Sequence, residues 1–144
     1  MLISQTLEYA LRAMVFIATG TGQSYTTLQI SQATKVPQAY LSKVLQLLVK
    51  AKLIQSQRGL GGGFVLNKEA KDICILDIVN AVDPLERIES CPLGISSHGN
   101  DLCRLHKKLD EAISVIEKDF TDTSITDIIT NPTSVLPLCE RPAM

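Results

Sequence analysis

Two cysteines and two histidines lie close together in the second half of the chain. Cys91 and Cys103 flank a segment containing proline, glycine and serine, His98 lies inside it, and His106 follows Cys103 by three residues. Thiolates and imidazoles are the protein ligands that zinc, iron and iron–sulfur clusters prefer. Because no Cys-x-x-Cys pair is present, the pattern disfavours a closed zinc site. It predicts a metal or cluster site, with two incidental cysteines in a loop as the alternative.

The surroundings of Cys103 and Cys74 predict different roles for these two cysteines. Cys103 falls at the expected start of a long helix, where the helix dipole favours a thiolate that suits ligation and redox chemistry. Cys74 lies in an apolar run and is expected to be a small core residue.

Charge divides the chain into two unlike halves. No acidic residue occurs between Glu8 and Glu69, and this stretch carries seven lysines and arginines. The rest of the chain carries seven basic residues and all fifteen acidic ones, so the net charge of −1 hides the division. A basic surface without carboxylates attracts a phosphate backbone, so the N-terminal half is predicted to bind double-stranded DNA.

The periodicity of that half indicates three helices. Residues 5–18 carry an apolar stripe after a capping Ser4, and a capping box at residues 26–29 precedes a short helix over 28–33. After a tight turn, Pro37 opens a longer helix, because proline suits a first helical position. A short helix, a turn and a longer helix together predict a helix-turn-helix.

A β-hairpin is expected directly after these helices. Residues 53–58 and 64–66 have strand character, and the segment between them is rich in glycine. No Gly-Lys-Ser/Thr ending follows the glycines, so a nucleotide site is disfavoured. The fold class is therefore mainly α with a small β-hairpin wing, a winged helix-turn-helix followed by a long C-terminal helix.

The expected DNA contacts follow from this arrangement. Glutamine can pair with adenine in the major groove, lysine can bind phosphate or base, and an arginine at the wing suits a narrow minor groove. Flanking glycines let the hairpin backbone approach phosphates. The candidate residues are Thr26, Thr27, Gln38, Ala39, Tyr40, Ser42, Lys43, Arg58, Gly59, Gly61 and Gly62. The alternatives are a partly buried structural role for Tyr40 and a winged helix that binds protein instead of DNA.

The C-terminal half is expected to form a sensor loop and a dimer helix. A fourth helix spans 75–82, and a long helix over 101–120 has a heptad-like apolar seam that favours a homodimer over packing on its own domain. A dimer would read a near-palindromic operator. We divide the chain into a DNA-binding domain (1–83), a cysteine/histidine sensor loop (84–100), a dimerisation helix with a short closing helix over 124–130 (101–132) and a flexible tail (133–144). No signal peptide or membrane span is visible, so a cytoplasmic protein without a membrane contact is expected.

Several of these segments resemble the Rrf2 family of bacterial winged-helix regulators, to which IscR and NsrR belong. The matching stretches are Leu7-Glu8-Tyr9-Ala10-Leu11-Arg12, Tyr40-Leu41, Arg58-Gly59-Leu60-Gly61-Gly62-Gly63-Phe64, Ile78-Val79-Asn80-Ala81-Val82-Asp83 and Cys103-Arg104-Leu105. The resemblance implies a homodimeric repressor or activator, with the long helix at the dimer interface and an iron–sulfur cluster held by the cysteine loop.

One departure affects the implied cluster. Cluster-binding members have three cysteines, of which the outer two match Cys91 and Cys103, and Ser97 stands midway between them. A serine hydroxyl seldom ionises at neutral pH and is a poor iron ligand. His106 matches a histidine of the IscR-like branch, and Glu8 matches an acidic ligand that some relatives contribute across the dimer. The alternative for Glu8 is a cap or an ion pair on the first helix. The resulting hypothesis is a 2Fe–2S cluster held by Cys91, Cys103, one histidine (His98 or His106) and Glu8 of a second protomer.

The leading hypothesis is a DNA-binding regulator whose cluster or redox state orders the 91–103 loop and so changes DNA affinity. One alternative keeps the DNA function but replaces the cluster with thiol oxidation, a small molecule or a protein partner. A second alternative is an iron–sulfur carrier or redox protein without a DNA role. An enzyme is disfavoured, because no nucleophile–base–acid set or phosphate loop is visible in the sequence.

Overall fold

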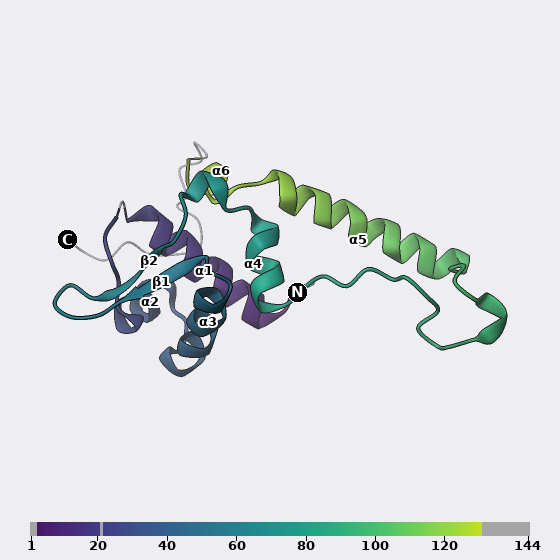
Figure 1. Cartoon of the computed structure of the whole chain (residues 1–144), viewed down its shortest axis with the longest axis horizontal. Helices are drawn as coiled ribbons and strands as arrows, with labels where there is room; N and C mark the ends of the chain where they lie inside the picture. The colour runs from purple at the N-terminus through teal and green to yellow at the C-terminus, as the bar shows by residue number, and fades with distance from the viewer. Residues whose placement is uncertain (1–2, 21, 131–144) are drawn as a thin grey trace.

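The computed structural model describes residues 3–20 and 22–130 of the chain (Figure 1). Its elements are α1 (Gln5–Thr19), α2 (Thr27–Thr34), α3 (Gln38–Lys50), β1 (Ile54–Gln57), β2 (Gly63–Leu66), η1 (Ala70–Asp72), α4 (Ile75–Val82), η2 (Ser96–His98), α5 (Arg104–Asp122) and α6 (Ile125–Thr130). The mainly α class with a hairpin wing is confirmed. The α4 bounds match the prediction at both ends, whereas the short 3-10 helices η1 and η2 were not predicted. The tail at 133–144 lies outside the described residues.

Local hydrogen bonds explain where the N-terminal helices begin. The Leu7 N–H donates to the Ser4 hydroxyl at 3.2 Å, which caps α1 as predicted. The capping box is also confirmed, since the Gln29 N–H donates to Thr26 Oγ1 at 3.2 Å and the Thr26 N–H to Gln29 Oε1 at 2.9 Å. Pro37 differs by one position from the prediction. It is the N-cap of α3, and its carbonyl accepts the Leu41 N–H at 2.9 Å.

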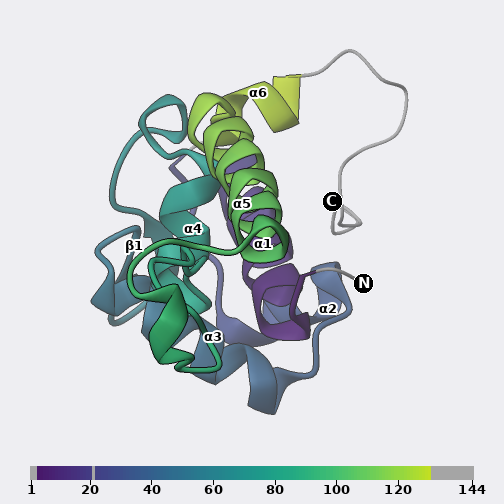
Figure 2. The ribbon, with the colours of Figure 1, turned by 90° about the vertical axis from the view of Figure 1, so that its right-hand side faces the viewer.

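The core lies between α1 and the helices that surround it, α2, α3, α4 and α6 (Figures 1 and 2). The largest fully buried side chains include Met14, Phe16, Ile17, Ile30, Leu41, Leu45, Leu48, Ile73, Ile78 and Ile125. Each such side chain contributes about 1.5–3 kcal/mol on burial. The core therefore holds the helix-turn-helix as one unit and includes the closing helix α6.

The wing is joined to this unit at its base. β1 and β2 pair antiparallel, with Gln57 opposite Gly63 at the tip end. The Tyr25 N–H donates to the Phe64 carbonyl at 3.1 Å, and the Phe64 N–H donates to the Tyr25 carbonyl at 2.7 Å. These two bonds bind β2 to the segment just before α2, so the wing has a defined place beside the helix-turn-helix.

The C-terminal helix α5 projects away from the winged unit, and an extended linker from the end of α4 runs beside it (Figure 1). Figure 2 shows the far end of this arm, with the loop before α5 facing the viewer. α5 begins at Arg104, three residues later than predicted, because Cys103 has extended backbone angles and is its N-cap. Within 3–20 and 22–130, no helix is long and apolar enough to cross a membrane.

Candidate nucleic-acid interface and sensor loop

α3 separates its residues into a buried and an exposed face. Its apolar side is buried against the core through Leu41, Val44, Leu45 and Leu48. The exposed residues include all five of the predicted contact positions on this helix, namely Gln38, Ala39, Tyr40, Ser42 and Lys43. Because a helix advances about 100° per residue, a 13-residue helix with one apolar side presents the opposite side to a partner.

Tyr40 combines the two roles that the sequence left open. It is 52% exposed, and its ring meets the Tyr9 ring edge-on with centroids 6.0 Å apart. Lys43 Nζ lies 6.0 Å from the Tyr40 ring centroid, and Arg12 Cζ lies 5.6 Å from the Tyr9 centroid. This row of cations and rings joins α1 to α3. The sequence did not single out Tyr9 for this contact, because it depends on how the two helices cross.

The glycines of the wing turn have a structural explanation in contacts within the protein itself. The Gly62 N–H donates to the Gly59 carbonyl at 2.9 Å, and Gly61 has φ +74°. A Cβ on Gly62 would lie 2.6 Å from the Gln57 carbonyl oxygen, so only glycine fits there without a shift. The Ser24 hydroxyl donates to the Gly61 carbonyl and holds the turn against the segment before α2. Ser24 was not predicted, because it is 37 residues from its partner in sequence.

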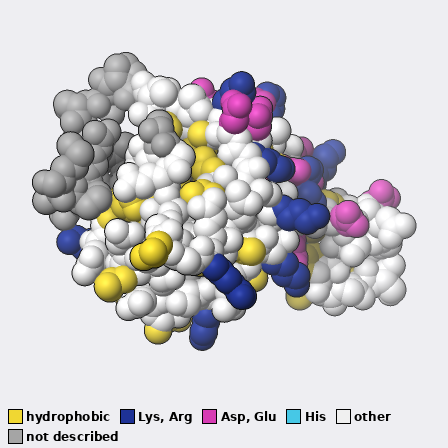
Figure 3. Space-filling view, turned by 60° about the vertical axis from the view of Figure 1, so that its left-hand side comes forward, with side chains coloured by type: hydrophobic (Ala, Val, Ile, Leu, Met, Phe, Trp, Pro, Cys, Tyr) yellow, Lys and Arg dark blue, Asp and Glu magenta, His cyan; other side chains and the backbone are white. Residues whose placement is uncertain are grey.

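Two side chains mark the apex of the wing. Arg58 is exposed beside the turn, as the sequence predicted. Leu60 projects fully into solvent at 108% relative exposure, although an exposed apolar side chain is not expected there from the sequence. On the face shown in Figure 3, Lys and Arg side chains appear at the left and lower edges without Asp or Glu, which gather toward the top and right. Thr26 is exposed and Thr27 half-buried at the start of α2.

The loop residues are only partly brought together. Cys103 Sγ lies 3.2 Å from His106 Nδ1, across the first turn of α5. Cys91 and Cys103 are half-buried free thiols, and the buried Nδ1 of His98 has no hydrogen-bond partner among the described residues. In the same described ranges, no group of three or more His, Cys, Asp or Glu converges on a metal position. The donor types fit an iron–sulfur centre, and Cys103 and His106 are in contact.

Glu8 and Cys74 have defined structural partners. Arg12 Nε lies 2.7 Å from Glu8 Oε2, and Arg12 Nη1 donates to the Thr34 carbonyl at 3.2 Å, so this pair links α1 to the end of α2. Cys74 is half-buried at the N-cap of α4, where its N–H donates to Asp77 Oδ2 at 3.0 Å. Burial raises the pKa of the Cys74 thiol, which favours the inert, protonated form.

Comparison with known proteins agrees with this geometry. Residues 3–131 match the Rrf2 family, described as iron-dependent transcriptional regulators. The chain is 33% identical over 132 residues to an HTH-type transcriptional regulator of Aquifex aeolicus (strain VF5), covering 90% of this chain and 92% of that protein.

Two solved structures share the fold. IscR of T. potens superposes with a TM-score of 0.74 at 23% identity, covering 91% of this chain and 88% of that chain. CymR of Staphylococcus aureus superposes with a TM-score of 0.72 at 24% identity, covering 91% of this chain and all of that chain (100%). With an exposed α3 face, a hairpin wing and a family match over nearly its whole length, the chain belongs to the Rrf2 family of DNA-binding transcriptional regulators.

Proposed function

We propose that this regulator binds near-palindromic double-stranded DNA as a homodimer, with α3 in the major groove and the wing along the adjacent minor groove. The observation that carries the proposal is the rigid connection between the two reading elements. The Tyr25–Phe64 bridge and the Ser24–Gly61 bond hold the wing tip at a fixed place relative to the start of α2. A preorganised pair of elements loses little conformational entropy when it binds two grooves.

The role of each residue in DNA binding follows from the chemistry of its exposed group. Gln38 carries both a donor and an acceptor for a base edge, and Lys43 and Arg58 supply charge for phosphates and the minor groove. Thr26, Thr27, Gly59, Gly61 and Gly62 approach the backbone of the duplex. We retain 1–83 as the DNA-reading domain, 84–100 as the sensor loop and 101–132 as the segment that contains the dimer helix α5, although its closing helix α6 packs into the core of the DNA-reading domain. We assign the protein to the cytoplasm and give it no catalytic role.

Selection of bound duplexes from a random pool, followed by titration against salt, tests the DNA function. We expect an enriched sequence with two related half-sites, and an affinity that falls steeply as salt rises because bound lysine and arginine release counterions. Failure to bind any duplex at low salt, or a flat response to salt, would contradict the proposal.

We also propose that the 91–103 loop controls DNA affinity through an iron–sulfur cluster. Cys91, Cys103 and His106, with His98 or Glu8 of the second protomer completing the set, are the residues that would hold it. The Cys103–His106 contact and the unpartnered buried nitrogen of His98 support this assignment. When bound, such a cluster supplies a redox-active or labile centre whose state depends on iron, oxidants or nitric oxide.

Anaerobic purification with iron, sulfide and visible-absorption analysis tests the cluster. We expect stoichiometric iron and sulfide, with absorption that disappears in a Cys103→Ala variant but persists in a Cys74→Ala variant. A colourless protein that takes up no iron on anaerobic reconstitution would reject the cluster.

A second mode of control keeps the DNA function and needs no cluster. Ser97 occupies the middle ligand position, and the contact between Cys103 and an imidazole is also the arrangement of a reactive thiol. In this case, alkylation of Cys103 changes DNA binding in metal-free protein. Under cluster control, alkylation of metal-free protein leaves DNA binding unchanged, and only loading with iron and sulfide alters it.

A further inference from the structure

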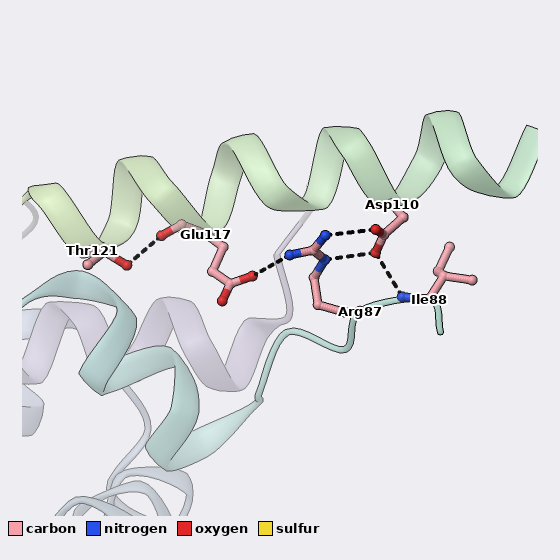
Figure 4. Close-up of polar contacts among 5 residues, drawn as sticks. All are labelled: Arg87, Ile88, Asp110, Glu117 and Thr121. Carbon is pink, nitrogen blue, oxygen red and sulfur yellow. Dashed lines mark hydrogen bonds and ion pairs between the residues drawn. The ribbon is translucent and has the colours of Figure 1, made fainter. Parts of the chain in front are cut away.

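The first part of the sensor loop, a linker that runs from the end of α4 toward Cys91, is fastened to α5 by an arginine. Arg87 Nε and Nη2 each donate to a different carboxylate oxygen of Asp110 at 2.7 Å, and Arg87 Nη1 donates to Glu117 Oε2 at 3.3 Å (Figure 4). The Ile88 N–H donates to Asp110 Oδ1 at 2.9 Å. We call these four residues, Arg87, Ile88, Asp110 and Glu117, the Arg87 clamp.

The clamp differs from the other ion pairs on α5. Lys108–Glu111 and Lys118–Asp122 join residues within the helix through one contact each, and all four of their side chains are more than half exposed. The Arg87 clamp joins two segments of chain by a bidentate pair and a backbone bond, and the Asp110 side chain is only 18% exposed. Fork-to-fork geometry fixes orientation as well as distance.

The pKa of Asp110 reflects the strength of this contact. Hydrogen bonds from the Arg87 guanidinium and from the Ile88 N–H lower it from 3.8 to about 2. The carboxylate is therefore ionised, and the clamp intact, throughout the physiological pH range.

The clamp closes a loop that contains the cysteine segment. The chain leaves the clamp at Ile88 and returns to it at Asp110, after the cysteine segment and the first six residues of α5, so residues 89–109 form a closed loop. Arg87 also spans two turns of α5, from Asp110 to Glu117, which fixes the register of the linker along the helix. Without such a contact, the linker slides along α5 when the loop rearranges, and α5 itself does not move.

We propose that Arg87 and Asp110 are positioning residues that couple the state of the sensor loop to the DNA-reading unit. With the clamp closed, a change in the loop moves the linker and α5 as one body, and the displacement reaches α4, which packs on α1 and α3. With the clamp open, the loop still changes state but the DNA-reading unit does not move, so DNA affinity stays the same. This inference rests on loop control of DNA binding as proposed above.

The test compares the DNA affinity of two loop states in each of several variants. The states are the anaerobically purified protein as isolated, and the same protein after treatment with an iron chelator and iodoacetamide, which removes bound iron and alkylates the accessible thiols, so that either mode of loop control changes the state of the loop. Arg87→Lys keeps the charge but loses the fork, Asp110→Asn keeps the shape, and the double variant Arg87→Asp with Asp110→Arg restores the pair. Lys118→Ala, which breaks an exposed pair on the same helix, is the matched control.

We expect the two states of the unchanged protein to differ in affinity by about tenfold, within the range of typical allosteric coupling. In Arg87→Lys and Asp110→Asn this ratio falls toward one, while the affinity of the unmodified state stays within about twofold, because neither residue lies in the DNA-reading unit. The double variant recovers part of the ratio, and Lys118→Ala retains all of it. A merely structural role would lower thermal stability without changing the ratio.

The outcomes separate the two proposals. A ratio of one in the unchanged protein overturns loop control, and the clamp inference with it. A ratio of about tenfold that persists in both single variants, or that Lys118→Ala reduces equally, overturns the clamp inference alone.

Discussion

Single side chains around α3 and the wing differ in what they can offer to DNA. The Ser42 hydroxyl already donates to the Gln38 carbonyl at 3.1 Å, so its proton is used within the helix. Lys43 lies over the Tyr40 ring, which limits the positions of its ammonium group. Arg58, at the wing, has no carboxylate within its own stretch of sequence. We therefore expect Arg58 to contribute the largest electrostatic share.

Arg58→Ala is predicted to weaken DNA binding by about 1–3 kcal/mol and to reduce the slope of log affinity against log salt by about one. The physical reason is the loss of one released counterion and of a guanidinium in the narrow groove. Titration of the selected duplex at several salt concentrations measures both quantities. Lys108→Ala, which removes an exposed charge from α5, should change neither. An unaltered salt slope in Arg58→Ala would place the wing away from the duplex.

The Asp110 carboxylate gives a prediction on pH. Its pKa is lowered from 3.8 to about 2 by the Arg87 hydrogen bonds, so its contribution to stability is complete above about pH 4 and is lost as pH falls through about 2. The difference in the free energy of unfolding between the unchanged protein and Asp110→Asn should be constant from pH 5 to 8 and shrink below about pH 4. Denaturant titration at each pH measures this. A difference that grows toward acid would show that Asp110 is not stabilised as an anion.

At the scale of elements, the wing depends on a backbone approach that no side chain permits. Gly63 has φ +145°, and a Cβ there would overlap backbone atoms of Tyr25. Gly61 also has a positive φ, but a Cβ on it would meet open space. The bridge from β2 to the segment before α2 therefore requires glycine at position 63, because a side chain there would overlap Tyr25. At position 61, glycine is favoured only by the positive φ of the turn.

Gly63→Ala is predicted to destabilise the fold by more than the roughly 1 kcal/mol expected for Gly61→Ala, because the first must displace Tyr25 and the second only strains φ. Thermal unfolding of the two variants gives the comparison. Gly63→Ala should also weaken DNA binding at a temperature where it remains folded, since the wing shifts relative to α3. Equal stability of the two variants would mean that the Tyr25–Phe64 bridge is not required for the wing.

At the scale of the whole molecule, α5 is the element that the chain itself leaves uncovered. It contains no buried residue, and its exposed apolar side chains include Leu105, Leu109, Val115 and Ile116. Leu105, Leu109 and Ile116 belong to the apolar seam expected from the sequence, together with Leu102, Ala112 and Ile113, whereas Val115 was not part of it. Phe120 packs against the core instead and joins the helix to the winged unit. A projecting helix with an apolar seam is suited to pairing with a second copy.

Leu109→Glu combined with Ile116→Glu is predicted to give a folded monomer, because two carboxylates per protomer would be buried between the paired helices. Sedimentation velocity measures the mass, and circular dichroism verifies that the helical content is unchanged. The affinity for a two-half-site duplex should fall by at least about tenfold, because one reader is lost. Lys108→Gln on the same helix should remain dimeric. A dimer that survives the double substitution would move the interface off this seam.

The sequence by itself determined the features that depend on neighbours within a few residues. The capping box at Thr26 and Gln29, the bounds of α4 and the glycine-rich turn follow from local hydrogen bonding and backbone freedom. The pairing of Cys103 with His106 is also local, since residues three apart share a helix face. The exposed side of α3 was predictable from its helical periodicity, and the class of fold from periodicity together with the strand and turn signals of the hairpin.

Tertiary structure decided the contacts between residues far apart in sequence. Arg87 and Asp110 are 23 residues apart, and Arg87 stands in a linker with no periodic pattern, so the sequence carries no sign that it lies beside α5. The same holds for Tyr9 with Tyr40 and for Ser24 with Gly61. Local preferences determine each element, but only the packing of the core determines which elements contact one another. The proposed coupling between the sensor loop and the DNA-reading unit depends on those contacts.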